Sequence, residues 1–257
     1  MRHSIAIAML LTSAVASTTF AASAPSCSGR SPAHTVALVE LYTSEGCSSC
    51  PPADHYLRSL RGAGLTTDQV APLSLHVDYW NYIGWRDPFS QALFTERQRS
   101  LAAAASTTLV YTPEFFLNGR EVRKWSNTLA DDIKRTNAQP ARADIGIAVE
   151  RGAGGALNVT VTGKGPAGAA LQVALQQSNL DSVVTRGENG GRTLHHDYVA
   201  RRWFSPVRLD AAGAARLAQA FTLPDTRPAG DYGVTAFIQS SDGKVLQAYS
   251  LPLCGTL

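Results

Sequence analysis

The sequence predicts a small α/β domain followed by an all-β domain of the sandwich type. Two observations lead to this fold class. Before Pro140, apolar strand-like runs alternate with helix-like stretches, whereas after it apolar and polar residues alternate with a period of two. Glycine-rich turns separate these later strands. We therefore place the two domains at residues 34–139 and 141–254.

Strands and helices alternate in the first domain. The apolar run at residues 36–42 is broken only by Glu40, which indicates a buried strand. Gly62 and Gly64 end the helix that follows, and Ser90 is a suitable N-cap for a longer one. The expected strands are 36–42, 73–77 and 115–117, and the expected helices are 52–61, 90–105 and 126–137.

Half-buried strands make up the second domain. Residues 145–149, 157–161 and 171–175 show the clearest alternation. Further strands are expected at 194–204, 218–223, 232–239 and 245–251. Seven or so short strands at this spacing favour a β-sandwich.

The first residues indicate the compartment. Arg2 precedes an apolar run at residues 5–15, which is too short to span a bilayer, and small residues continue to Ala24. This is the layout of a secretory signal peptide at residues 1–24, cleaved after Ala21 or Ala24. We expect a secreted or periplasmic protein with no membrane anchor in the mature chain.

Charge argues against a nucleic-acid partner. The 257 residues carry a formal net charge of +3, of which Arg2 supplies one, so the mature chain carries about +2. Its basic residues are scattered rather than clustered. The expected partner is instead a protein or small-molecule thiol or disulfide, and no cofactor is implied.

Four cysteines divide into two pairs by position. Cys27 and Cys254 stand near the ends of the mature chain, and neither opens a helix, so we expect them to form a structural disulfide. The alternative is that one of them is buried and free, or that both pair between molecules. Cys47 and Cys50 form a Cys-x-x-Cys between a strand and a helix.

A Cys-x-x-Cys at a helix start suits thiol chemistry. Unpaired amides and the helix dipole there lower the pKa of the first thiol. Cys47 is expected to be the exposed attacking thiol and Cys50 the resolving one. The prolines at 51 and 52 are expected to keep Cys50 and Pro51 out of the helix and so expose the cysteine loop.

A second segment, YTPEFFLNGR, supports this hypothesis. Thr112–Pro113 stands just before a strand, where a cis peptide bond is a reasonable expectation. The strand, the Cys-x-x-Cys helix and this proline segment resemble the thioredoxin superfamily. In that superfamily a cis-proline loop faces the cysteines and binds the substrate chain.

Longer stretches extend the resemblance over nearly the whole mature chain. ELYTSEGCSSCPPAD, HVDYWNYIGWRDPF and RGENGGRTLHHDYVAR are similar to a family of bacterial secreted proteins catalogued as a domain of unknown function, number twelve-twenty-three. The superfamily resemblance implies that Cys47 is the nucleophile, Cys50 the resolving thiol and Pro113, after Thr112, the cis-proline. Glu40 matches the buried proton-relaying acid more loosely, and a strand-end glutamate facing solvent is the alternative. The redox direction stays open.

Two other function classes are compatible with these residues. Cys47, Cys50 and His55 offer two thiolates and an imidazole, a set that suits copper or another thiophilic metal. A non-catalytic binding module with a permanently closed disulfide is the other alternative. The secreted setting and the proline loop favour the oxidoreductase, so no metal site is assigned.

Aromatic residues crowd the connection after the second strand. We expect Tyr79, Trp80 and Trp85 to wall the substrate groove, because that connection lies at the same end as the cysteines. Packing against the β domain is the alternative. Further along, RGENGGR is expected to be a hairpin turn, and His195 and His196 to point to opposite faces of a strand.

Overall fold

One nine-stranded sheet runs through the protein, of which the computed structural model describes residues 26–152, 156–223 and 227–254. The predicted signal peptide at residues 1–24 lies outside the described residues. The strands of this sheet are β2 (Ala37–Thr43), β3 (Val70–His76), β4 (Glu114–Leu117), β5 (Arg120–Glu121), β8 (Ala170–Gln177), β11 (Val199–Trp203), β12 (Val207–Arg208), β14 (Tyr232–Gln239) and β15 (Val245–Pro252).

The strand order is β15-β14-β8-β11-β3-β2-β4-β5, with β12 paired to β8 beside this path. β2 and β3 run parallel, β4 runs antiparallel to β2, and β5 closes a hairpin with β4. The strands from the second half of the chain are antiparallel to one another and join β3 through β11, which runs parallel to it. The sheet therefore crosses the proposed division at Pro140.

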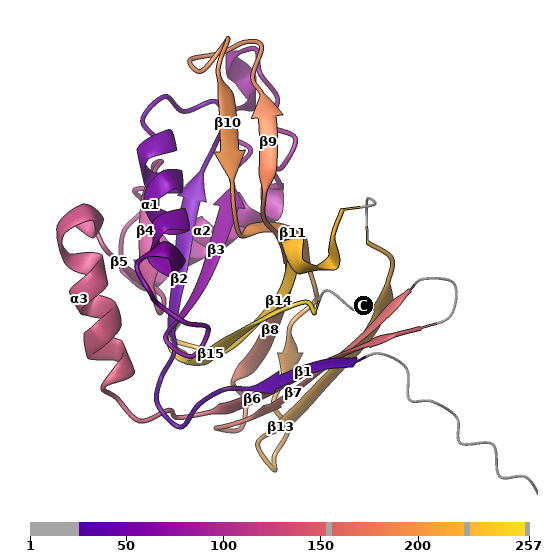
Figure 1. The fold of residues 1–257 in the computed structure, drawn as a ribbon. Helices are drawn as coiled ribbons and strands as arrows, with labels where there is room; N and C mark the ends of the chain where they lie inside the picture. Colours follow the sequence, from indigo (N-terminus) through magenta and orange to yellow (C-terminus); the bar gives the residue numbers. More distant parts are fainter. Residues whose placement is uncertain (1–25, 153–155, 224–226, 255–257) are drawn as a thin grey trace, which may run out of the picture.

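Three α-helices among the described residues cover the N-terminal part of this sheet (Figure 1). They are α1 (Pro51–Gly62), α2 (Ala92–Ala104) and α3 (Trp125–Asn137). α1 and α3 pack on one face and α2 on the other. None of the helices described is long and apolar enough to cross a membrane.

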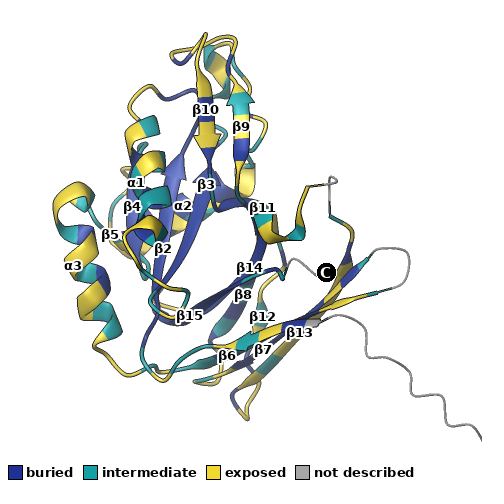
Figure 2. Ribbon diagram, in the orientation of Figure 1, coloured by how far each residue is buried: buried dark blue, intermediate teal, exposed yellow. Residues whose placement is uncertain are grey.

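Strand β2 is buried on both faces, as its continuous apolar run predicts. Leu38 and Tyr42 pack toward α2, whereas Val39 and Leu41 pack toward α1 and α3. Figure 2 shows the central strands as the most deeply buried part of the fold. Such a strand holds its C-terminal end, where the cysteine loop begins, in a fixed position.

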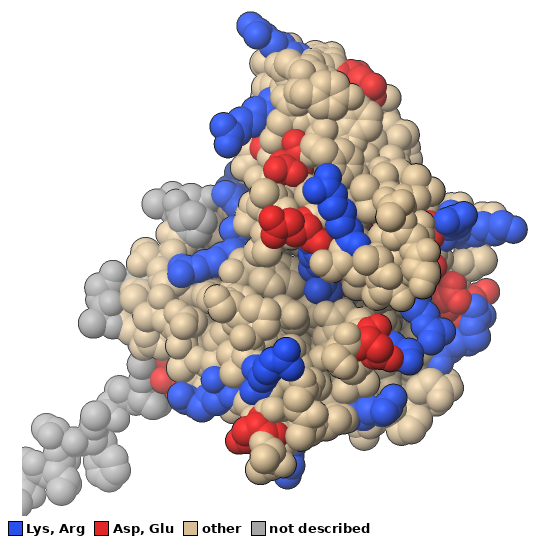
Figure 3. Space-filling model, turned by 180° about the vertical axis from the view of Figure 1, so that it is seen from behind, with Lys and Arg blue, Asp and Glu red and all other residues tan. Residues whose placement is uncertain are grey.

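A second sheet packs against the other end of the large one. Its order is β1-β6-β7-β13, formed by β1 (Ser26–Arg30), β6 (Asp144–Arg151), β7 (Leu157–Lys164) and β13 (Ala214–Phe221). One apolar cluster joins its inner face to β8, β14 and β15. On the face shown in Figure 3, basic and acidic side chains are interspersed.

A two-stranded hairpin, β9 (Leu180–Val183) and β10 (Thr193–His196), rises beside α1 (Figure 1). Its connection contains the predicted glycine-rich turn. The single strand expected at residues 194–204 is wrong, because the chain turns at Tyr198, whose φ is +57°, and divides into β10 and β11.

Ser90 is also not the N-cap of α2. Gln91 takes that position, and Ser90 instead donates its hydroxyl to the Asp87 carbonyl.

Candidate functional site

The cysteine loop, residues 44–50, joins the end of β2 to the start of α1. Cys47 and Cys50 form a disulfide with their Cα atoms 5.4 Å apart. Cys50 is the N-cap of α1, and its carbonyl accepts hydrogen bonds from the amides of Ala53 and Asp54. The disulfide therefore lies at the positive end of the helix dipole, where a thiolate is stabilised.

Two expectations about this loop are wrong. Pro51 is the first helical residue, and Cys50 has helical φ and ψ, because prolines are tolerated in the first turn of a helix. Cys47 is also not exposed: it is 1% accessible and Cys50 0%. Only Ser48 and Ser49, between the cysteines, face solvent.

The β9–β10 connection, residues 184–192, covers one side of the cysteine loop. Glu188 accepts a hydrogen bond from the Ser48 amide at 2.9 Å. The buried amide of Asn189 donates to the carbonyls of Glu45 and Cys47, at 2.8 and 3.0 Å. These three bonds attach the second half of the chain to the Cys-x-x-Cys turn.

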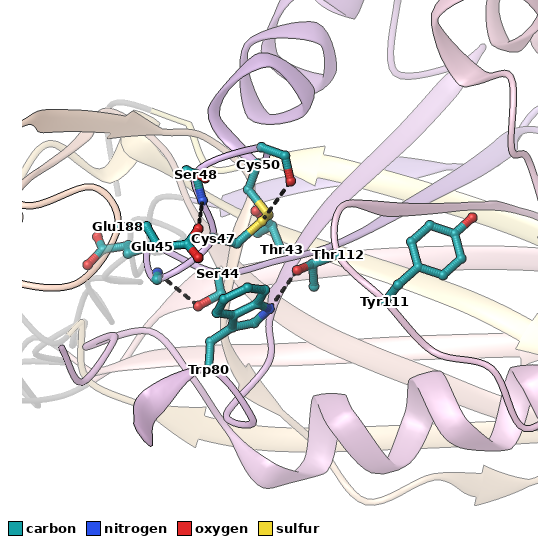
Figure 4. Close-up of a disulfide and its surroundings, with 12 residues drawn as sticks. Thr43, Ser44, Glu45, Cys47, Ser48, Cys50, Trp80, Tyr111, Thr112 and Glu188 are labelled. Atoms are coloured by element: carbon teal, nitrogen blue, oxygen red, sulfur yellow. Dashed lines mark hydrogen bonds between the residues drawn. A yellow bond between two sulfur atoms is a disulfide. The ribbon is translucent and has the colours of Figure 1, made fainter. Parts of the chain in front are cut away.

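The proline segment lies on another side of the loop (Figure 4). The Thr112–Pro113 peptide bond is cis. Trp80 links this segment to the loop, because its Nε1 donates to Thr112 Oγ1 at 2.7 Å while its Cβ lies against Gly46. A Cβ atom at position 46 would stand 3.1 Å from atoms of Trp80 and Ile83, a tight contact that glycine avoids.

The three aromatic residues expected to wall a groove lie in different places. Trp80 and Trp85 flank the cysteine loop, and Trp85 Nε1 donates to the Glu45 carboxylate at 2.7 Å. Tyr79 turns toward α2, where its hydroxyl donates to Gln98 at 3.2 Å. The turn η1 (Asn81–Ile83) separates the two tryptophans and exposes Tyr82.

Glu40 is buried in β2, so the alternative of a solvent-facing glutamate is wrong. Arg97 of α2 holds its carboxylate with two bonds, Nε to Oε1 at 2.6 Å and Nη2 to Oε2 at 3.0 Å. The Tyr42 hydroxyl also donates to it at 3.4 Å. A carboxylate held by two bonds from one guanidinium is a structural ion pair.

Residues that sequence reasoning did not connect to the site gather beside the cysteine loop. His76, at the end of β3, pairs through Nδ1 with Asp87 at 2.7 Å, and both side chains are fully buried. His196, at the end of β10, approaches Glu45 with Nε2 at 3.1 Å from Oε1. The two imidazole centroids are 5.0 Å apart. The sequence predicts only that His195 and His196 point to opposite faces, and in the structure His195 is exposed and His196 is buried.

His76 and Asp87 shift each other's pKa in opposite directions. Burial would lower the pKa of His76, but the carboxylates of Asp87, Asp54 and Glu45 outweigh it and raise that pKa above its usual value. Burial would likewise raise the pKa of Asp87, but His76 and the amides of Glu45 and Phe89 hold it below its usual value. His76 and Asp87 thus form a charge-stabilised pair.

His55 does not approach the cysteines as a metal ligand would. It is exposed on α1, and Arg58 Nη2 lies 2.8 Å from its Nδ1. Within the described ranges, no group of three or more His, Cys, Asp or Glu side chains is arranged to hold a metal ion.

The remaining cysteines join the ends of the described chain. Cys27 in β1 is bonded to Cys254, two residues after β15, with Cα atoms 5.7 Å apart and a sequence separation of 227. Cys27 belongs to the apolar cluster between the two sheets. This bond lies away from the cysteine loop.

Sequence comparison places the chain in a family. Residues 38–239 match the family described as "Protein of unknown function (DUF1223)", and that range includes the cysteine loop, the proline segment and the β9–β10 hairpin. The chain belongs to DUF1223. No curated protein matches the sequence.

Two solved structures are similar to this DUF1223 protein. Protein AGR_C_4864 from Agrobacterium tumefaciens is 27% identical, with a TM-score of 0.60 over 85% of this chain and 94% of that one. HBP35 of Porphyromonas gingivalis is 17% identical, with a TM-score of 0.62 over 87% of this chain and 76% of that one. At that identity the second likeness concerns the fold alone.

Proposed function

We propose that this protein is a thiol–disulfide oxidoreductase whose reactive pair is Cys47 and Cys50. The observation that carries the proposal is the place of the Cys-x-x-Cys disulfide, at the end of a buried strand and the start of α1. Helix-start amides stabilise the Cys47 thiolate that such chemistry needs. An adjacent Cys50 is available to resolve a mixed disulfide.

The reaction proceeds by two exchanges. The Cys47 thiolate attacks one sulfur of a substrate disulfide, so the substrate S–S bond breaks, a Cys47–substrate disulfide forms and one substrate thiolate leaves. Cys50 loses its proton and attacks Sγ of Cys47, which releases the second substrate thiolate and forms the Cys47–Cys50 bond. Two electrons pass to the substrate, and the two protons given up by the cysteines balance the two taken up by its thiolates. Run in reverse, the same steps oxidise a dithiol.

The elements around the loop support a thioredoxin-like core at residues 34–139. β3, β2, β4 and β5 are adjacent in the sheet, with α1 and α3 on one face and α2 on the other. Trp80 and Thr112 are hydrogen-bonded to each other beside the cysteine loop (Figure 4), and the cis bond to Pro113 follows directly, which supports a substrate-binding role for this segment. In this proposal residues 141–254 form the second, β-sandwich domain, which shares the large sheet and lends the β9–β10 hairpin to the site.

Access to the disulfide requires part of its cover to move. Both sulfurs are buried, while Trp80 on one side and the Glu188–Asn189 turn on the other touch the loop. The protein or small-molecule substrate would enter between these two walls, next to Trp85. A secreted or periplasmic location suits this chemistry, since the four cysteines of the described chain are all paired.

Reduction of a protein disulfide tests the proposal. The reduced protein is mixed with insulin in the presence of excess dithiothreitol, and its oxidised form with a reduced, unfolded disulfide protein. We expect wild type to accelerate one of these reactions and Cys47→Ser to remove the acceleration. The control is the double variant Cys27→Ala/Cys254→Ala, which lacks the other disulfide and should still accelerate the reaction. Equal rates with wild type and Cys47→Ser in both directions would contradict the proposal.

A further inference from the structure

A groove with a volume of about 530 Å³ lies between α2 and the strands of the second half of the chain. Its walls are α2, residues 203–206 at the end of β11 and the turn from β14 to β15, and Gln172 of β8 completes the lining. None of the lining residues belongs to the cysteine loop or to the β9–β10 hairpin. This α2 groove is therefore a separate hollow, and ligand sites commonly form where two parts of a protein meet.

One side of α2 lines the groove along most of the helix. Leu93, Arg97, Leu101 and Ala104 belong to the lining, and their spacing of three or four residues puts them on one side of the helix. Leu93 is 42% exposed, whereas Leu101 is buried. The first turn of α2 therefore contributes apolar surface that is open to solvent.

Trp203, the last residue of β11, has its indole ring fixed in place beside the groove. Its Nε1 donates to Gln172 Oε1 at 3.2 Å, and the Arg97 guanidinium lies 5.1 Å from the ring centroid. Phe94 and Phe237 contact the ring edge to face. The side chain is nevertheless only half-buried, and it lines both the α2 groove and a second hollow beside residues 216–219. An indole held in this way presents a rigid aromatic surface on which a ligand can stack.

The charged side chains of the groove favour a neutral ligand. Of the described residues that line it, only Glu96 and Arg97 carry charge. Arg97 is paired with Glu40 through a contact of 2.6 Å and also donates to Gln239 at 3.3 Å, so its charge is already balanced. The lining therefore lacks an unpaired cation of the kind that holds a phosphate or a carboxylate.

Several polar groups of the lining have hydrogen-bonding capacity left. Gln172 uses its side-chain oxygen for Trp203, and its amide nitrogen has no partner among the described residues. The Glu96 carboxylate and the hydroxyls of Ser205 and Ser241 are likewise without a partner there, and these three residues are exposed. Donors and acceptors are thus both available next to the aromatic surface, and a hydroxyl group can use both kinds at once.

We propose that the α2 groove binds a neutral saccharide, with one sugar ring stacked on Trp203. A pyranose ring presents C–H groups on its faces, which pack against an indole. The hydroxyls around its edge match the free amide of Gln172 and the carboxylate of Glu96. The volume of about 530 Å³ lies within the range of roughly 300–1,000 Å³ that small-molecule sites occupy. The inference goes beyond the proposed redox function and does not depend on it.

Calorimetric titration tests the inference. Maltotriose, cellotriose and chitotriose, which are neutral trisaccharides with different linkages and ring substituents, are titrated separately into the oxidised wild-type protein. We expect at least one of them to bind with 1:1 stoichiometry and a Kd on the order of 1 mM or below. The same sugar should bind Cys47→Ser equally well, because the cysteine loop lies outside the groove. Absence of binding by all three sugars would overturn the inference.

Filling the groove shows whether the sugar binds there. Ala104 and Gly243 approach each other in the lining, since the Ala104 Cβ lies 3.5 Å from the position that a Cβ of Gly243 would occupy. In Ala104→Phe a phenyl ring takes up part of the groove, and we expect the affinity to fall at least about tenfold. Ala103→Phe adds the same ring at an exposed position of α2 outside the lining, so this matched control should keep the wild-type affinity. Equal affinities of the two variants would mean that the sugar binds elsewhere and would reject the site.

Two further measurements test the stacking on Trp203. Of the four tryptophans in the sequence, Trp203 alone lines the groove, so sugar binding should change the tryptophan emission of wild type but not that of Trp203→Phe. Gln172→Leu keeps the size of the side chain but removes its amide, and it should lower the affinity roughly five- to tenfold, as for one lost hydrogen bond. An equal emission change in Trp203→Phe would place the sugar at another tryptophan and contradict the proposal. If circular dichroism shows that Trp203→Phe does not fold, the comparison of Ala104→Phe with Ala103→Phe decides.

Discussion

At the scale of single residues, the carboxylate of Glu188 lies against the turn that contains Cys47. It accepts a hydrogen bond from the Ser48 amide, and this bond lowers the pKa of Glu188. The same negative charge disfavours a Cys47 thiolate. In Glu188→Gln we expect iodoacetamide to alkylate Cys47 of the reduced protein faster at pH 7, by roughly a factor of two to five, as for one exposed charge at close range. A rate at or below that of wild type would contradict this assignment.

Glu114, directly after Pro113, makes stability depend on pH. Burial, reinforced by the carboxylate of Glu121, raises the pKa of Glu114 to about 7, although Gln98 donates to its Oε2 at 2.6 Å. A carboxyl with a raised pKa binds its proton more tightly in the folded state. Its contribution to stability is therefore complete below the unfolded pKa near 4.5 and is lost as the pH rises through 7.

Glu114→Gln should remove that pH dependence. We expect it to raise the free energy of unfolding in urea at pH 8 by on the order of 1–2 kcal/mol, and to leave it nearly unchanged at pH 4. Glu96→Gln, an exposed substitution on α2, is the control and should show neither effect. An equal change for Glu114→Gln at both pH values would mean that the carboxyl is not protonated in the fold.

At the scale of elements, the β9–β10 hairpin brings two buried side chains to the cysteine loop. Its turn carries Asn189, and the end of β10 carries His196. Asn189→Ala should release the turn from the Cys47 carbonyl and expose the disulfide. We expect dithiothreitol to reduce Cys47–Cys50 roughly tenfold faster, a factor that corresponds to about 1.4 kcal/mol of lost hydrogen bonding. Arg186→Ala, in the same connection, is the control. Unchanged reduction in Asn189→Ala would mean that the hairpin does not cover the site.

Local sequence patterns were sufficient to predict most helices and strands, but they did not predict the β9–β10 hairpin. The strand expected at residues 232–239 is β14 to the residue, and the apolar run before the cysteines predicts β2 within one residue at each end. β9 was missed because LDSV is short and lacks alternation, and β10 was merged with β11 because nothing in the sequence marks the turn at Tyr198. Hydrogen bonds between the two segments hold the turn, from the Tyr198 amide to Ser178 and from the Asn179 amide to Asp197.

The same distinction applies to the candidate site. Cys47, Cys50 and Pro113 could be proposed from the sequence because their chemistry is visible in short motifs. Asp54 and His196 are 142 positions apart, so only folding brings them to one cavity. The burial of Cys47 was missed for the same reason, since residues 184–192 supply its cover.

At the scale of the whole molecule, Cys27–Cys254 ties the first described strand to the end of the last one. It closes a loop of 227 positions. In the chain-entropy account, Cys27→Ala/Cys254→Ala should lower the free energy of unfolding by at most about 5 kcal/mol, because residual structure in the denatured chain reduces the effect. Urea unfolding measures the loss. No loss at all would mean that this disulfide does not constrain the unfolded chain.

Trapping a mixed disulfide tests the central claim most directly. Cys50→Ser leaves Cys47 as the attacking thiol and removes the group that resolves the adduct. Reduced Cys50→Ser protein is incubated with a disulfide-bonded protein, quenched with acid and digested without reductant, and the linked peptides are identified by mass spectrometry. We predict a stable adduct joined through Cys47, and none with Cys47→Ser. An adduct formed through Cys50 in Cys47→Ser but absent in Cys50→Ser, or no adduct in either variant, would contradict the account.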